Sequence, residues 1–190
     1  MSLSEIRNWA KQECGLEILN EVVNAGGNGN MCARNIEIYI QKLIVQAQPD
    51  KVVVLADLDP ERCAPCISER KKIIGHKNID LVVIARKAME SWFIADTQMM
   101  RKWLGDVNFY EDKPEDTKIM PWDYLKELGL KYKERGVGNK VRCAHLFINQ
   151  YGFEVKQAAK HPACPSARYF VDKLCALGKM SYQPSITDNW

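Results

Sequence analysis

Two acidic residues that directly follow an apolar run are the clearest sign of chemistry in this sequence. Val52 to Ala56 are all apolar, and Asp57 and Asp59 follow them with one residue between. Such a run is typical of a strand buried on both faces of a parallel sheet. Ligands of open α/β sheets bind beyond the carboxyl ends of the strands. The pattern therefore predicts that Asp57 and Asp59 bind a phosphate or a hard cation such as Mg²⁺, which takes oxygen ligands.

The same two acids also have a structural interpretation. Strand ends in α/β proteins often carry an Asp that caps the next helix. Pro60 is tolerated in the first turn of a helix, so Asp59 could cap a helix that starts at Pro60 or Glu61. The sequence leaves the cap and the metal site open as alternatives.

A basic segment in the second half of the chain is the next candidate for binding. Its cations surround Gly136 and Gly138, with Glu134 as the opposing charge, and they are Lys131, Lys133, Arg135, Lys140 and Arg142. Such a loop either contacts phosphates or is simply solvated surface. The formal net charge of +3 is too small to indicate nucleic-acid binding by itself.

The cysteine pattern favours a reduced setting. There are 7 cysteines, an odd number, and no secretion signal is recognisable at the N-terminus. A cytoplasmic location is therefore expected, and no apolar run is long enough to span a bilayer. Cys63 and Cys66 form one CxxC motif, which is compatible with packed cysteines, a zinc site or a redox pair. Because no second CxxC matches it, we expect this pair to be reduced and metal-free.

The periodicity of the chain predicts the elements that position the acids. A helix over about 61–74 and a second buried strand over 80–85 complete a βαβ unit with the first strand. A long helix fits 88–104, and Asp96 lies on its apolar face as either a structural acceptor or part of a site. From 105 onward only helical patterns occur. We therefore expect an α/β core over 1–104 and a helical C-terminal region over 105–190 packed on it, as one compact unit.

Three segments together resemble a family of small bacterial and archaeal proteins of unknown function related to the Toprim domain. They are Asp57-Leu-Asp59, the segment from Arg86 through Glu90-Ser-Trp92 to Asp96, and Cys164-Pro-Ser166-Ala-Arg168-Tyr-Phe170. The resemblance covers roughly residues 16–178. It implies a mostly parallel, Rossmann-like sheet flanked by helices.

The resemblance also implies a function. In Toprim domains an Asp-x-Asp pair and a separate Glu bind Mg²⁺ for phosphoryl transfer on nucleic acid, as in nucleases. Asp57 and Asp59 would be the metal ligands, and Glu90 a further acid of the catalytic site. Arg86, Lys87 and the basic segment would meet the phosphates of DNA or RNA.

The sequence departs from the family at one point. The Toprim Glu normally ends an earlier strand, and no such strand is recognisable before Asp57. This departure keeps a second reading open, a catalytically inactive Toprim-like module of a defence or toxin–antitoxin system. Such a module would bind nucleic acid or a partner protein.

Overall fold

Two parallel strands joined by a helix form the centre of the fold. The structure is a computed structural model, and it describes residues 7–59 and 64–181. Strand β1 (Val53–Asp57) pairs with β2 (Leu81–Ala85), and helix α3 (Ala64–Ile74) lies between them in the chain. Val53 lies opposite Leu81 and Asp57 opposite Ala85. The predicted βαβ unit is thus confirmed, although within the described residues the sheet has these two strands alone.

The two faces of this small sheet are covered by different helices. Alternate strand residues Ala56 and Ile84 pack against Ile36 and Ile40 of α2 (Ala33–Ala47) and Ile74 of α3. The intervening strand residues face the C-terminal helices and belong to the main core. Successive side chains of a strand point to opposite faces of the sheet, and helices cover both faces here. This explains why the strand sequences are apolar at consecutive positions and do not alternate with polar residues.

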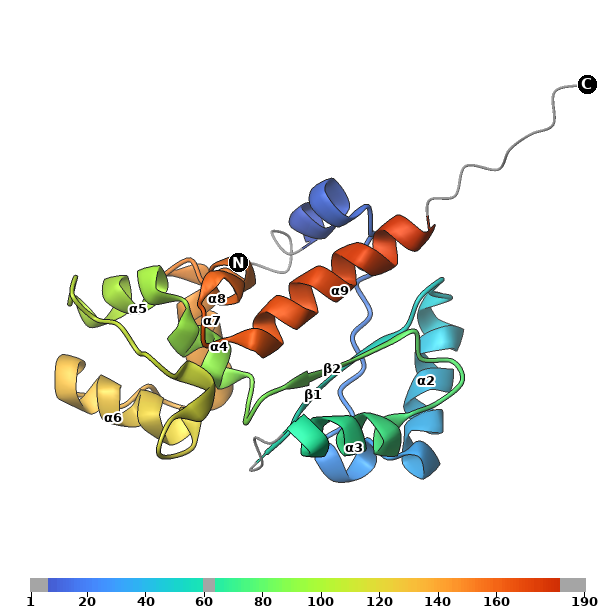
Figure 1. Ribbon diagram of the computed structural model, residues 1–190, viewed down its shortest axis with the longest axis horizontal. Helices are drawn as coiled ribbons and strands as arrows, with labels where there is room; N and C mark the ends of the chain where they lie inside the picture. The colour runs from blue at the N-terminus through green and yellow to red at the C-terminus, as the bar shows by residue number, and fades with distance from the viewer. Residues whose placement is uncertain (1–6, 60–63, 182–190) are drawn as a thin grey trace, which may run out of the picture.

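The segment before α2 contains apolar residues but forms no strand. Residues 16–25 form no regular element apart from a bend, and Figure 1 shows them as an extended thread leading from the N-terminal helical turn towards α2. Leu19 is 37% exposed and Val22 is 76% exposed. Its apolar residues come in adjacent pairs and do not alternate, so a strand here would have no consistent buried face.

Six α-helices follow β2 in the described chain. They are α4 (Glu90–Ala95), α5 (Thr97–Leu104), α6 (Pro121–Lys133), α7 (Lys140–Asn149), α8 (Val155–Lys160) and α9 (Pro165–Ser181). Figure 1 shows α9 running diagonally past both the strands and the group formed by α4 to α8. Among the described residues, the structure contains no helix that is both long enough and apolar enough to cross a bilayer.

The predicted helix over 88–104 is broken at Asp96. Its carboxylate accepts a hydrogen bond from the Met99 backbone N–H at 3.0 Å, which caps α5. The other carboxylate oxygen accepts from the Glu154 backbone N–H at 2.9 Å, just before α8 begins. Asp96 is 1% exposed, so these two bonds satisfy a carboxylate in the core. Of its two predicted roles, the structure shows the structural acceptor.

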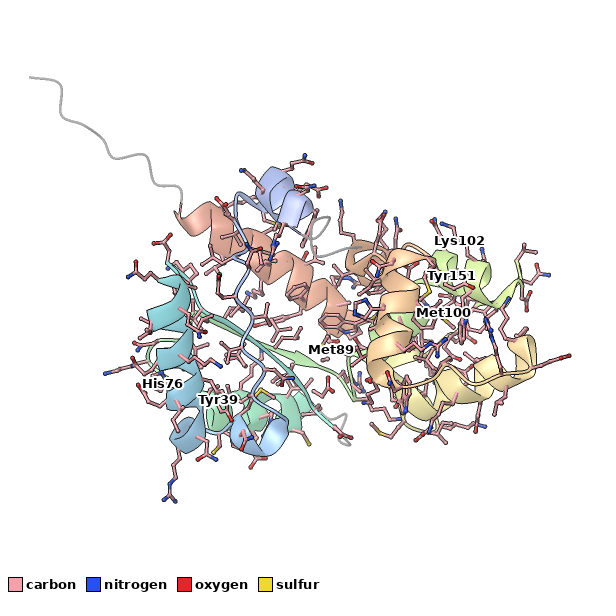
Figure 2. All side chains as sticks on the ribbon, turned by 180° about the vertical axis from the view of Figure 1, so that it is seen from behind. Tyr39, His76, Met89, Met100, Lys102 and Tyr151 are labelled. Carbon is pink, nitrogen blue, oxygen red and sulfur yellow. A yellow bond between two sulfur atoms is a disulfide. The ribbon has the colours of Figure 1, made fainter. Side chains whose placement is uncertain are left out.

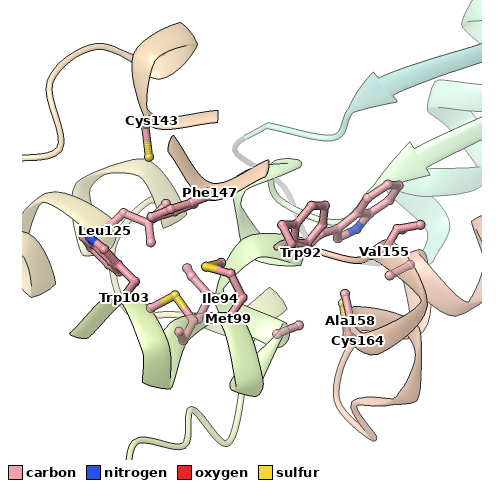
Figure 3. Close-up of a cluster of buried hydrophobic side chains, with 14 of the residues drawn as sticks. Trp92, Ile94, Met99, Trp103, Leu125, Cys143, Phe147, Val155, Ala158 and Cys164 are labelled. Atoms are coloured by element: carbon pink, nitrogen blue, oxygen red, sulfur yellow. The ribbon is translucent and has the colours of Figure 1, made fainter. Parts of the chain in front are cut away.

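The largest apolar core lies among the helices and crosses the predicted boundary at residue 104. In Figure 3, Trp103 of α5, Leu125 of α6 and Phe147 of α7 converge on one another. The Trp103 and Phe147 rings meet edge to face at 4.8 Å. The same cluster extends from Val83 of β2 to Ala167 of α9. The two predicted regions therefore share one core.

The N-terminal helical turn is fastened to the last helix. The turn η1 (Ala10–Cys14) packs on α9, and Cys14 forms a disulfide with Cys175. A Cβ built on Gly178 would lie 1.8 Å from the Cys14 carbonyl oxygen, so only glycine allows this approach. The expectation of reduced cysteines is wrong for this pair, because the packing of η1 on α9 brings Cys14 within reach of Cys175, which is distant in the sequence. It is also wrong for Cys66, which is disulfide-bonded, whereas Cys63 lies outside the described residues.

Candidate functional site

The carboxyl end of β1 continues beside the residues that follow β2. The Leu58 N–H donates to the Ala85 carbonyl at 3.0 Å, and the Asp59 N–H donates to the Lys87 carbonyl at 2.9 Å. The Asp57 carboxylate accepts from the Met89 N–H at 2.9 Å, just before α4. In Figure 2, Met89 marks the place where the strands lead into the helical group. Asp57 is thus tied to the start of α4, and a cap at Pro60 or Glu61 would lie outside the described residues.

Glu90 joins these two acids from the neighbouring strand end. It is the first residue of α4 and is 8% exposed. Its Oε1 accepts from the Lys140 ammonium at 2.7 Å. Its Oε2 is buried and has no hydrogen-bond partner among the described residues. Lys140 is the first residue of α7, a helix that Asn139 caps by accepting from the Arg142 N–H at 2.8 Å.

The charges of these groups are coupled. Burial raises the pKa of Asp57, the Met89 hydrogen bond opposes this, and the charges of Glu90 and Asp59 raise the pKa further. Burial alone would lower the pKa of Lys140, but its bond to Glu90 and the charges of Asp57 and Asp59 raise it overall. We call Asp57, Asp59 and Glu90 the acidic centre. Lys140 is its counterion.

The two basic residues just after β2 have other partners. Lys87 has a positive φ of 66° and is 5% exposed. Its ammonium donates to the Thr117 carbonyl and, at 2.8 Å, to the Ile119 carbonyl. Arg86 lies near the buried Glu115, whose pKa its charge lowers. In this arrangement Lys87 holds the loop at 117–119.

The basic segment does not act as one unit. Lys131 and Lys133 lie in the last turn of α6, where the Lys131 ammonium is 5.0 Å from the Tyr132 ring centroid. Lys133 lies beside Gly105 at the end of α5. Arg135 follows α6, and Arg142 lies in the first turn of α7. Of the five predicted cations, Lys140 is the one that forms an ion pair with the acidic centre in the part of the chain described here.

A buried carboxylate that the sequence does not reveal lies behind α4. Glu115 is 1% exposed and accepts hydrogen bonds from the Ser166 N–H at 3.0 Å, the Ser166 hydroxyl and the Cys164 thiol. The Trp92 indole N–H donates to the Ser166 hydroxyl oxygen at 2.7 Å. This network joins the segment around Trp92 to the segment around Ser166. Glu115 itself lies in an acidic stretch that has no helical or strand period, so no pattern marks it as buried.

Trp122 is a further candidate that no sequence pattern marks. It lies in the first turn of α6 and is half-buried. The ammonium groups of Lys126 and Lys140 each lie 5.9 Å from its ring centroid. The sequence gives Trp122 only as a helix-starting residue after Pro121. Its closeness to Lys140 depends on how α6 and α7 pack, which no local pattern shows.

Two further observations limit what the site can be. No group of three or more His, Cys, Asp or Glu side chains is arranged to hold a metal ion within residues 7–59 and 64–181. A cleft of about 360 Å³ lies between α5 and α8, and Arg101, Tyr110, Lys160 and His161 help to line it. None of the acidic-centre residues lines that cleft. The predicted chemistry therefore depends on the strand ends and not on the cleft.

Comparison with known proteins adds no relative. No protein-family model matches the chain, and neither a curated protein nor a solved structure matches it significantly. What the molecule shows is an α/β fold with a small parallel sheet flanked by helices, and an end of β1 where Asp57 and Asp59 are hydrogen-bonded to the segment that leads into Glu90.

Proposed function

We propose that the acidic centre carries out magnesium-dependent phosphoryl transfer on nucleic acid, as a Toprim-like nuclease does. One observation carries the proposal. The Asp57 carboxylate accepts from the Met89 N–H at 2.9 Å and the Asp59 N–H donates to the Lys87 carbonyl at 2.9 Å, which places the end of β1 beside the segment that leads into Glu90. Carboxylates that repel one another at the carboxyl ends of parallel strands favour the binding of a cation there.

The donor set suits magnesium. All three side chains offer carboxylate oxygens, and the Glu90 Oε2 has no partner among the described residues. Mg²⁺ commonly binds through one or two carboxylates and keeps several waters, so a ready group of three ligands is not required. When bound, the ion would stabilise charge on the transferred phosphoryl group. Asp57 and Asp59 would hold it, Glu90 would orient its waters, and Lys140 would contact a phosphate oxygen.

A second function is favoured by the ion pair itself. Lys140 already neutralises Glu90 at 2.7 Å, as expected of a site that has lost its metal. The protein would then be a catalytically inactive Toprim-like binding module of a defence or toxin–antitoxin system. It would still hold nucleic acid or a partner protein at the same strand ends.

Magnesium titration and cleavage assays separate these functions. Isothermal calorimetry should show weak Mg²⁺ binding to the wild type, and labelled DNA or RNA should be cut only when Mg²⁺ is present. The double variant Asp57→Asn/Asp59→Asn should lose both signals. Asp172→Asn is the matched control, because Asp172 lies exposed on α9.

The outcomes are distinct. Binding and cleavage that depend on Asp57 and Asp59 support the enzyme. Nucleic-acid binding without Mg²⁺ uptake or cleavage supports the inactive module. Identical Mg²⁺ titrations of the wild type and the double variant would show that the metal assignment is wrong.

A further inference from the structure

Trp122 differs from the other tryptophans that the structure describes. Trp9, Trp92 and Trp103 are 6%, 4% and 3% exposed, whereas Trp122 is only half-buried. The indole N–H groups of Trp9 and Trp92 donate to Glu13 and Ser166. The Trp122 indole N–H has no such partner among the described residues. Trp122 therefore keeps both ring surface and a donor available.

Two lysines flank this ring. Lys126 lies one turn after Trp122 on α6, on the same side of the helix, and Lys140 reaches the ring from the start of α7. Both ammonium groups lie 5.9 Å from the ring centroid, a distance at which a cation is attracted to an aromatic face. Lys126 also pairs with Asp123 at 2.6 Å, and its side chain is 45% exposed. A ring with two accessible cations near it matches the chemistry of a nucleotide within a strand, which has a flat base and an anionic phosphate on either side of its sugar.

Lys140 connects this ring to the acidic centre. Its ammonium bonds to Glu90 at 2.7 Å while lying near the Trp122 ring. The Asp57 carboxylate accepts from the N–H of Met89, the residue before Glu90, so Lys140 links the neighbourhood of Asp57 to Trp122. A strand whose base stacks on Trp122 would present the neighbouring phosphate to the acidic centre.

We propose that Trp122 is a base-stacking platform and that the substrate of the acidic centre is single-stranded nucleic acid. The inference rests on the proposed function only where it says that the bound strand is cleaved, because stacking itself requires no metal. In a duplex the base faces are covered by their neighbours, so only an unpaired base can lie on the indole. Stacking on an aromatic side chain is independent of sequence. The platform therefore selects unpaired strands and not a particular sequence.

The test compares oligonucleotides that differ in their bases but not in their charge. Anisotropy of a labelled oligothymidylate of about ten nucleotides, within the roughly 4–16 that small single-strand sites cover, is compared with an abasic strand with the same phosphates and with a duplex. Measurements are made in EDTA and in Ca²⁺. The wild type should bind the oligothymidylate more tightly than the abasic strand, and the duplex should bind no better than the abasic strand. Equal affinity for all three overturns the proposal and needs no variant.

Variants locate the platform. Trp122→Leu keeps an apolar side chain for packing but removes the ring, and should weaken oligothymidylate binding by about five-fold or more. Binding of the abasic strand should change little, and Trp122→Phe should keep most of the preference for bases. Tyr132→Leu is the control, because Tyr132 also lies beside a lysine but at the other end of α6. An unchanged preference in a folded Trp122→Leu protein contradicts the assignment.

Failure of the platform and failure of the proposed enzyme give different results. Base-dependent binding that is lost in Trp122→Leu, with no cleavage in Mg²⁺, supports the platform and rejects the enzyme. Magnesium-dependent cleavage of duplex and single strands at the same rate, unchanged in Trp122→Leu, supports the enzyme and rejects the platform.

Discussion

At the scale of single residues, Lys140 controls how exposed the acidic centre is to cations. Lys140→Gln removes the counterion of Glu90 and Asp57 and keeps a side chain of similar length. We expect the variant to be less stable than the wild type in EDTA, by about 1 kcal/mol, the upper range for an accessible ion pair. Added Mg²⁺ should then raise its melting temperature more than that of the wild type, because a ligand that binds only the folded state stabilises that state more when it binds more tightly.

The control for this prediction is Lys131→Gln, which removes an equal charge from the last turn of α6. It should respond to Mg²⁺ as the wild type does. If Lys140→Gln and Lys131→Gln show the same magnesium shift in differential scanning calorimetry, the cation does not bind at the acidic centre.

Glu115 should give the protein an unusual dependence on pH. Burial raises the pKa of Glu115 from its ordinary value of 4.5, and bonds from Ser166 and Cys164 and the charge of Arg86 only partly oppose this. The folded state therefore binds more protons than the unfolded state. The free energy of unfolding falls as pH rises from 4.5 through the raised pKa, by at most about 1.4 kcal/mol per pH unit.

Glu115→Gln tests this prediction, because it keeps the shape and removes the titration. Urea unfolding at about pH 5 and pH 7 should show the wild type losing stability relative to Glu115→Gln as the pH rises. His161, whose pKa burial lowers, changes stability in the opposite direction, but it is present in both proteins and cancels in the comparison. If the free energies of unfolding of the two proteins depend on pH in the same way, the pKa of Glu115 does not differ between the folded and unfolded states.

These residues show what local patterns can reveal. Asp57 and Asp59 were found because an apolar run marks a buried strand and its end marks a ligand edge. The sequence presents Lys140 only as one of five cations, since its pairing with Glu90 depends on the packing of α7 against α4. Glu115 and Trp122 were missed for the same reason. Their roles come from partners distant in the sequence.

At the scale of elements, the contact between η1 and α9 depends on one glycine. Gly178→Ala would place a Cβ 1.8 Å from the Cys14 carbonyl oxygen, so the two elements must move apart. Alanine favours a helix by about 1 kcal/mol over glycine, but overpacking of this kind typically costs about 1–3 kcal/mol. We expect a net loss of stability in urea unfolding.

Gly136→Ala is the matched control, because a Cβ there meets no atom within 4 Å. It should leave stability unchanged or slightly raised. If Gly178→Ala is as stable as Gly136→Ala, then η1 does not pack on α9 in solution.

The elements also show where periodicity succeeds and where it fails. Periodicity marks α2, because Ile36 and Ile40 lie one turn apart and pack together against the sheet. The prediction of one helix over 88–104 misses the break at Asp96, since the apolar period continues through that residue. A carboxylate in that stripe was the available sign, because it can cap a new helix where it stands.

At the scale of the whole molecule, the basic residues should divide into two groups by position. Lys126 and Lys140 flank Trp122, whereas Lys131 and Lys133 lie towards the other end of α6, roughly 16 Å further along the helix for Lys133. Each phosphate contact to a single strand contributes about 0.7 to the slope of log affinity against log salt. Lys126→Gln/Lys140→Gln should therefore flatten this slope by about 1.4.

The comparison variant is Lys131→Gln/Lys133→Gln, which removes the same charge. Its slope should stay close to that of the wild type in the same anisotropy titrations. Equal flattening in both double variants would show that the strand is held by the general charge of the molecule and not at the acidic centre.

The disulfide between Cys14 and Cys175 joins residues 161 positions apart and closes a covalent loop of the polypeptide. The strands, the acidic centre and the segment after α6 all lie within this covalent loop. A single backbone cut within the loop opens it, but both fragments stay covalently attached through the disulfide. Trypsin that cuts after Arg135, in the loop between α6 and α7, should therefore yield one band without reductant and two with it. The two fragments of a nicked molecule would stay covalently linked through the disulfide between Cys14 and Cys175.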